Sequence, residues 1–436
     1  MKDNANENTI DPCLPGGLMP ADQWTLPETS VRRSLKDAIR HALMQLQAGV
    51  SQAEESFENM DQLPELSTAQ QRRLAPEPDY SHQALAIACA LECARSEGSL
   101  SREVICLVAP PFSGLQQALA HFSEPFRSDN RENSVDALRV ISPPDTLLLD
   151  DQAAREWWDN QDLSRPWVIP ELADFWLRCL SGLALVKELF RRIANGDAGA
   201  GIVGSSSWCW QYWGHYIENA HMSPWTTAPM NSERLGVWFS HLAAGGSKSS
   251  ITAKMTDNGL YVLPLVEPEE VPSGKDSNEH KESNKRKYST FLRDLSATSR
   301  GNPGVALAIW QRSLRARPDE DARLDDADQK SQAQNLNADC WVVPLNRLSL
   351  PLMPQSKESV TGFVLHGLLL HNGLDAPSLE SVTGVSAHEL SMVLSRLKRA
   401  ELVAFDQACQ CWRVTAIGYP TARRHLQSWG FPVDQF

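Results

Sequence analysis

The sequence lacks the features of a membrane or secreted protein. No apolar run approaches the roughly 18 residues that a membrane-spanning helix needs, and the polar first 17 residues contain no apolar segment typical of a secretory signal. Positive charge is not in excess, because 41 Lys and Arg residues stand against 54 Asp and Glu residues, giving a formal net charge of −13. This balance excludes a protein that coats nucleic acid over its whole surface, but it is compatible with a local basic patch. The sequence predicts a cytoplasmic protein without a membrane span.

Metal-binding motifs are also missing. The nine cysteines contain no paired Cys-x-x-Cys motif, and no second pair follows Cys409 and Cys411, which stand only two positions apart. A structural zinc site needs four ligands at suitable spacing. We therefore expect no metal site, and we expect the cysteines to be reduced thiols that are mostly buried.

The chain is long enough for two or three domains, because a single core stops growing at roughly 250–300 residues and this chain has 436 residues, 42% of them hydrophobic. Residues 1–30 are polar and contain several Pro, which predicts a flexible tail. In the segment 31–79, apolar residues recur at alternating spacings of four and three, which predicts an amphipathic helix followed by a linker. These residues are Ile39, Leu43, Leu46, Val50, Ala53, Phe57 and Met60. The stripe fits either a helix that docks a protein partner or one that packs on the chain's own body.

Short apolar segments separated by helical ones predict an α/β core over residues 80–268. The five segments are residues 104–108, 138–141, 167–169, 201–204 and 260–266. Buried strands that alternate with helices are typical of a three-layer fold with a mostly parallel sheet. Ligands of such folds bind at the carboxyl ends of the strands.

A strand, a turn and a helix follow one another over residues 103–121, as they do in a phosphate-binding loop. In the motif G-x-x-x-x-G-K-[ST], the Lys reaches the phosphates and the hydroxyl holds Mg²⁺. Here Ser113 and Gly114 are followed by Leu115 and Gln116, and two prolines in the turn lack N–H donors. The remaining backbone amides near Phe112 are candidates for holding a nucleotide, and the alternative is a purely structural core.

The last third of the chain is predicted to be helical and to contain two linkers. A polar linker covers residues 269–287, two helices follow over residues 288–316, and an acidic linker covers residues 317–337. Residues 338–436 then contain helices at 362–371, 379–383 and 387–399 and a hairpin formed by residues 402–405 and 411–414. A helix, a helix-turn-helix and a wing make a winged-helix domain.

The order of these pieces resembles the AAA-lineage P-loop NTPases, especially the STAND and origin-recognition-like branches, over roughly residues 80–430. Residues 104–114 are similar to the Walker A position, residues 167–171 to Walker B, residues 202–205 to sensor 1, and residues 260–266 to the last core strand. Residues 301–303 are similar to the G-x-P motif of the helical lid, whose loop packs near the adenine. The resemblance implies nucleotide binding, of ATP or ADP, by Phe112, Ser113, Gly114, Leu115, Ser205, Gly301 and Pro303.

Two departures from that family predict little or no ATP hydrolysis. A Walker B strand ends in adjacent acids that hold Mg²⁺ and polarise the attacking water, whereas Glu171 stands between Pro170 and Leu172. Glu171 is thus the one candidate catalytic carboxylate at this position. Without the Walker A Lys, charge on the phosphates is largely uncompensated, and the loss of such contacts typically lowers rates by orders of magnitude.

Three functions remain open from the sequence. The first is a degenerate AAA- or STAND-type protein that acts in regulation or assembly through protein partners, including copies of itself, bound by the N-terminal helix and the winged helix. The second is a winged-helix DNA-binding protein that uses Arg396, Lys398 and Arg399 on the third helix. The third is an active ATPase with an atypical phosphate loop.

Overall fold

The computed structural model describes residues 11–27, 63–100, 102–123, 138–219, 222–244, 251–264, 287–316, 338–354 and 360–436. The amphipathic stripe predicted over residues 39–60, nearly all of the linker 269–287 and the acidic linker 317–337 lie outside these ranges. Among the described residues, no helix combines the length and apolar composition needed to cross a bilayer.

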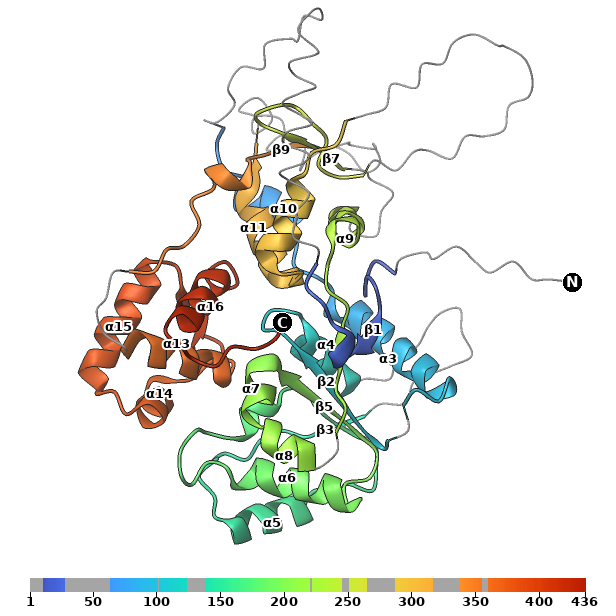
Figure 1. The fold of residues 1–436 in the computed structure, drawn as a ribbon, viewed down its shortest axis with the longest axis vertical. Coiled ribbons are helices and arrows are strands. Elements are labelled where there is room, and N and C mark those ends of the chain that lie inside the picture. Colours follow the sequence, from blue (N-terminus) through green and yellow to red (C-terminus); the bar gives the residue numbers. More distant parts are fainter. Residues whose placement is uncertain are drawn as a thin grey trace, which may run out of the picture.

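A six-stranded sheet of order β1-β6-β2-β5-β4-β3 forms the centre of the molecule (Figure 1). Its strands are β1 (Leu18–Pro20), β2 (Val104–Ala109), β3 (Arg139–Val140), β4 (Trp167–Ile169), β5 (Gly201–Ser206) and β6 (Trp225–Thr227). All neighbours are parallel except β1 and β6. This confirms the predicted mixed α/β fold with a mostly parallel sheet, which is consistent with a P-loop NTPase-like core.

Helices cover both faces of this sheet. They are α3 (Tyr80–Ser96), α4 (Leu115–Ala120), α5 (Asp151–Asp159), α6 (Ala184–Asn195), α7 (Ser207–Tyr212) and α8 (Gly214–Asn219). Successive strand residues point to opposite faces, so Ile105 and Leu107 of β2 pack with α3 and α4, while Cys106 packs in the cluster that contains α5 and α6. Burial on both faces explains why β2 is an uninterrupted apolar run.

A second, three-stranded sheet and its helices lie above the central sheet in Figure 1. The strands are β7 (Ile251–Met255), β8 (Leu314–Arg315) and β9 (Ala338–Val342), and the helices are α2 (Thr68–Leu74), α9 (Ser232–Ala244), α10 (Phe291–Ser299) and α11 (Pro303–Ser313). The Phe239 ring of α9 stacks on Trp310 of α11 with centroids 5.0 Å apart. Short 3-10 turns occur at Ala21–Gln23, His121–Ser123, Leu172–Phe175 and Leu345–Arg347.

The prediction that residues 260–266 form the last core strand is wrong. β6 occupies that place in the central sheet. Within the described part of the segment, Tyr261 makes isolated bridges to Lys254 and Tyr288, and Val262 and Leu263 are buried in the cluster of α9, α10 and α11. A short apolar run predicts that its residues are buried, but it does not predict in which hydrophobic core they lie.

The flexible tail predicted over residues 1–30 is also partly wrong. β1 pairs with β6 in antiparallel register, with Leu18 opposite Thr227, and Leu14 and Ala21 are buried. The reason is that β6 would otherwise be an edge strand with unpaired backbone groups. A polar segment can pair with β6, because the hydrogen bonds between strands are made by backbone groups and not by side chains.

The C-terminal module, residues 360–436, consists of three helices, a two-stranded hairpin and a fourth helix. These are α13 (Val360–Leu370), α14 (Ala376–Thr383), α15 (Ala387–Arg399), β10 (Val403–Asp406), β11 (Cys411–Val414) and α16 (Tyr419–Ser428). Gly384 ends α14 in the left-handed region at φ 70°, and the Ser386 side chain accepts a hydrogen bond from the Glu389 N–H at the start of α15. The module, in orange and red, lies beside the central sheet in Figure 1.

Candidate functional site

The central sheet has a crevice where its strand connections diverge. β2 and β5 are neighbours, but the chain leaves β2 toward β3 at one edge and leaves β5 toward β6 on the opposite side of β2. Ligands of α/β proteins bind at the carboxyl ends of strands at such a point. A cavity of about 80 Å³, here called the smaller cavity, lies there. The segments that follow β2, β4 and β5 line it together with α13 and β11 of the C-terminal module.

The loop between β2 and α4 is held by the start of α11. Phe112 and Gly114 both have positive φ, 69° and 83°, and a non-glycine residue keeps such a conformation only where its surroundings enforce it. Asn302 Nδ2 donates a hydrogen bond to the Pro111 carbonyl at 2.6 Å, and the Gly304 N–H donates to the Phe112 carbonyl at 3.1 Å. A Cβ at Gly304 would lie 2.2 Å from that carbonyl oxygen. The predicted lid motif therefore lies directly on the predicted phosphate loop.

A second cavity, of about 300 Å³ and here called the larger cavity, also borders this loop. Its lining is mostly apolar and includes Leu14, Tyr80, Met230, Trp238, Pro303 and Leu307. Polar and charged residues also line it, among them Glu77, Asp79, His82, Gln83, Ser113 and His241. A mainly apolar cavity of this size with a few polar groups is typical of small-molecule sites.

Six of the seven predicted nucleotide-binding residues border the two cavities. Phe112, Ser113 and Gly114 border both, Pro303 borders the larger one, and Leu115 and Ser205 border the smaller one. Gly301 borders neither, and its carbonyl accepts a hydrogen bond from the Met230 N–H at 2.9 Å. The fold thus brings six of the seven predicted residues to the two cavities beside the loop that follows β2.

Glu171, the candidate catalytic carboxylate, lines the smaller cavity but is engaged by the backbone. Its Oε1 accepts hydrogen bonds from the Ala173 N–H at 3.0 Å and the Ser206 N–H at 2.9 Å. Burial, followed by the charge of Asp174, raises the pKa of Glu171 to about 8. A carboxyl group that is mostly protonated at neutral pH is a poor ligand for Mg²⁺ and a poor general base.

Arg413 provides the cation of this site. Of the described residues that line the smaller cavity, it alone is basic. Its charge lowers the pKa values of Glu171 and Asp174 against the larger opposing effect of burial. Asp174 is exposed to solvent on one side, and the surrounding protein atoms raise the pKa of its carboxyl group while Arg413 lowers it.

The C-terminal module also reaches the site through a chain of amides. Asn372 Nδ2 donates to Gln116 Oε1 at 2.7 Å, and Gln116 Nε2 donates to Asp174 Oδ2 at 3.4 Å. Neither Asn372 nor Arg413 is predicted from the sequence as a residue of this site, because both lie about 200 positions or more from the strands they face. A polar residue after α13 and a basic residue in a hairpin strand are weak signals, because neither belongs to a spaced motif.

Two buried histidines join the C-terminal module to the core. The Arg178 N–H donates to His371 Nε2 at 3.3 Å, and the Arg178 guanidinium lies 3.3 Å from His366 Nδ1. The Trp176 ring centroid is 4.4 Å from that of His371. Burial, with Arg178 as the next cause, lowers the pKa of His366 to about 4 and that of His371 to about 3. Both imidazoles are therefore neutral at pH 7.

The last described residues connect three parts of the molecule. Asp434 pairs with Arg423 at 3.1 Å and accepts a hydrogen bond from the Ser207 hydroxyl of α7. Arg300, which follows α10, donates to the Phe436 carbonyl at 3.0 Å. This segment therefore connects the core, the α10–α11 pair and the C-terminal module.

A cysteine and a histidine meet in the larger cavity. Cys13 Sγ lies 3.8 Å from His241 Nε2, an arrangement that can activate a nucleophile. Burial, followed by the carboxylates of Asp11 and Asp79, raises the pKa of Cys13. The sulfur therefore stays a thiol at neutral pH, and the pair does not form an activated nucleophile.

The predicted DNA-binding residues lie apart from both cavities. Arg396, Lys398 and Arg399 are exposed at the end of α15, and Lys398 Nζ lies 6.0 Å from the centroid of the Trp412 ring. Basic residues in the last turn also compensate the helix dipole. Their position is compatible with phosphate contacts and with a purely structural role.

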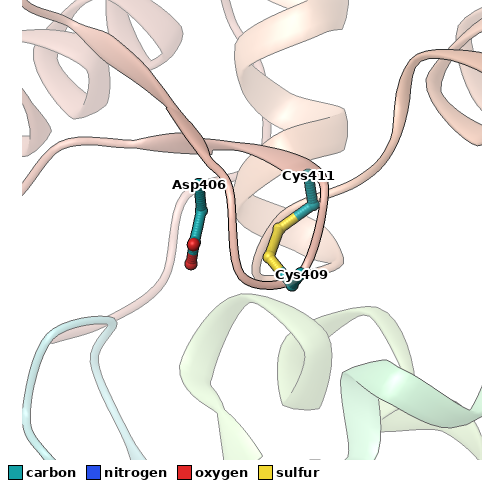
Figure 2. A group of neighbouring side chains, drawn as sticks. All are labelled: Asp406, Cys409 and Cys411. Carbon is teal, nitrogen blue, oxygen red and sulfur yellow. A yellow bond between two sulfur atoms is a disulfide. The ribbon is translucent and has the colours of Figure 1, made fainter.

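The expectation that all cysteines are reduced thiols is wrong for one pair. Cys409 and Cys411 form a disulfide across the turn between β10 and β11 (Figure 2), with Cα atoms 5.3 Å apart. The hairpin turn brings the two residues together, whereas spacing alone argues only against a zinc site. The carboxylate of Asp406 and both sulfur atoms lie within 4.8 Å of one another.

No protein-family model matches this chain, and no curated protein matches it. Among solved structures, a RuvB variant of Thermotoga maritima is 13% identical, over 80% of this chain and 93% of that chain, with a TM-score of 0.29. The ORC2 protein of Aeropyrum pernix, solved in ADPNP–ADP complexes, is 11% identical, over 93% of this chain and 97% of that chain, with a TM-score of 0.25. Similarity at these TM-scores says nothing about the ligands of this chain.

Proposed function

We propose that this chain is a degenerate AAA- or STAND-type NTPase-like protein that holds a nucleotide without hydrolysing it and acts in regulation or assembly. One observation carries the proposal: the start of α11 holds the loop after β2, and this loop borders both the mainly apolar cavity of about 300 Å³ and the cavity of about 80 Å³ that Arg413 lines. The larger cavity suits a nucleoside, and the smaller one suits a phosphate group.

The same residues argue against hydrolysis. Leu115 stands where the phosphate-binding Lys would be and is buried in the core of α3 and α4. Glu171 is mostly protonated and bonded to backbone amides. Of the described residues that line the smaller cavity, Arg413 is thus the one cation that can offset the phosphate charge. We expect one cation to support binding but not phosphoryl transfer, which needs a preorganised site.

Calorimetry with ATP and ADP, with and without Mg²⁺, tests the binding. We expect both nucleotides to bind with little dependence on Mg²⁺ and without release of phosphate. Leu307→Trp fills the larger cavity and is expected to weaken ADP binding by about tenfold or more. Ala308→Trp, on the same helix but outside the cavity lining, is the matched control. Turnover that disappears in Glu171→Gln would instead support the active ATPase.

A second function, DNA binding by the C-terminal module acting as a winged helix, is favoured by the three exposed basic residues at the end of α15. Replacing Arg396, Lys398 and Arg399 with Ala should then weaken duplex binding and reduce the slope of log affinity against log salt by about 3. Arg72→Ala/Arg73→Ala, exposed on α2, serves as the control. Undetectable duplex binding at low salt would leave the module as a protein-docking element.

A further inference from the structure

The two sulfur atoms of the hairpin disulfide have different surroundings. Cys409 is exposed at the turn, whereas Cys411 is only 8% exposed and lies in β11. Figure 2 shows the S–S bond closing the turn. A reductant that needs access to a sulfur atom therefore reaches Cys409, because thiol–disulfide exchange depends on which sulfur can be attacked.

Arg413 is in contact with the buried sulfur. Its Nε donates a hydrogen bond to Cys411 Sγ at 3.2 Å. Arg413 is also the one cation among the described lining residues of the smaller cavity, where it acts on Glu171 and Asp174. The Arg413 guanidinium therefore contacts the disulfide and also lines the smaller cavity at the ends of the parallel strands.

We propose that Cys409–Cys411 is a thiol–disulfide exchange site, attacked at Cys409 by a dithiol reductant, and that Arg413 couples its redox state to anion binding in the smaller cavity. The exchange chemistry is independent of the proposed nucleotide binding. The coupling to anion binding rests on that proposed function.

The exchange proceeds in two steps. A thiolate of the reductant attacks Cys409 Sγ, the Cys409–Cys411 bond breaks, and its electron pair leaves on Cys411 as a thiolate beside Arg413. The second thiol of the reductant loses its proton to solvent and attacks the reductant's own sulfur in the mixed disulfide. Cys409 is released and takes up a proton. Two electrons pass from the dithiol, which becomes a cyclic disulfide, to the protein.

Arg413 favours this direction of attack. A leaving sulfur departs faster when its thiolate is stabilised, and a cation in hydrogen-bond contact stabilises it. The carboxylate of Asp406, within 4.8 Å of both sulfur atoms, disfavours negative charge on them. Arg413 donates its hydrogen bond to Cys411, and so the negative charge is held at Cys411 while Cys409 is released as a thiol.

Reduction of the disulfide then changes how strongly the Arg413 guanidinium can bind an anion. In the oxidised form its partner at the hairpin is a neutral sulfur, which is a weak acceptor. In the reduced form the partner is a thiolate, and an ion pair at this distance competes with any phosphate for the guanidinium. The oxidised chain is therefore the form that binds anions more tightly.

The exchange is tested on the full chain by timed reduction with dithiothreitol in the presence of a chelator, followed by alkylation and peptide mass mapping of Cys409 and Cys411. Arg413→Gln is expected to slow the reduction roughly tenfold, and Arg413→Lys to restore part of the rate. Arg424→Gln, an exposed position on α16, controls for net charge. Early in the reaction, the mixed disulfide with dithiothreitol should be found on Cys409 and the alkyl group on Cys411. Equal rates in all four proteins, or a mixed disulfide on Cys411 with the alkyl group on Cys409, would overturn the exchange mechanism.

The coupling is tested by titrating ADP and inorganic phosphate into the oxidised and reduced chain. Reduction should weaken both ligands several-fold, and Cys409→Ser/Cys411→Ser should bind as the oxidised form does under either condition. Binding that reduction does not change would overturn the coupling. If neither form binds either ligand, the coupling and the proposed nucleotide binding both fail, while the reduction rates still decide the exchange mechanism.

Discussion

Acidification from pH 7 to pH 4.5 is expected to destabilise the contact between the C-terminal module and the core. His366 and His371 are neutral in the folded chain, with pKa values lowered to about 4 and about 3 from an ordinary value of 6.5. Below pH 6.5 the unfolded chain binds protons at these positions and the folded chain does not. Stability is therefore full above pH 6.5 and falls as the pH drops toward the folded values.

The expected loss is large. At pH 4.5 each histidine lies about 2 pH units below its unfolded pKa, which corresponds to about 2.5 kcal/mol per residue. The pKa values of Glu171 and Asp174 are raised, and these groups act in the opposite direction by stabilising the folded chain as the pH falls. A simple pH profile of the melting temperature thus sums opposing effects.

A double variant isolates the histidine contribution. His366→Gln/His371→Gln keeps neutral hydrogen-bond acceptors beside Arg178 but removes the titration. Its melting temperature should be lower than that of the wild type at pH 7, and the difference should shrink or reverse at pH 4.5. His388→Gln, an exposed histidine on α15, should follow the wild type throughout. Parallel pH profiles for the wild type and the double variant would contradict the assignment.

The elements best predicted from the sequence are those whose own residues determine them. β2 and β4 are short apolar runs because they are buried on both faces, and their positions follow from the pattern alone. α15 runs over Ala387–Arg399, as predicted, because Gly384 and Ser386 end one helix and start the next through local backbone chemistry.

What the sequence did not reveal depends on contacts between distant segments. β1 forms because its backbone groups can pair with those of β6. No side-chain pattern in the tail predicts this pairing. Val262 and Leu263 were assigned to the wrong core because periodicity indicates burial without naming the neighbour. Arg413 lines the smaller cavity only because the C-terminal module packs against the core. No sequence motif relates a residue of the hairpin to the end of β4.

Replacement of Glu171 by Gln is expected to stabilise the folded chain, and to do so more strongly at pH 8 than at pH 5. Because the pKa of Glu171 is raised from 4.5 to about 8, its contribution to stability is full below pH 4.5 and is lost as the pH rises toward 8. The loss at pH 8 is on the order of 4 kcal/mol. Gln cannot ionise, yet its carbonyl oxygen can still accept the bonds from the Ala173 and Ser206 N–H groups.

Chemical denaturation at pH 5 and pH 8 measures the effect, with Glu103→Gln, an exposed residue immediately before β2, as the control. The result also distinguishes a protein that does not hydrolyse nucleotides from an active ATPase. A Glu171 that stays ionised to bind Mg²⁺ or to activate water would have its charge stabilised by the two backbone N–H groups, and Gln would then cost about 1–3 kcal/mol. Stabilisation at pH 8 means that the folded state disfavours the ionised form of the carboxyl group at the end of β4. A loss of stability at pH 8 would instead favour the active ATPase.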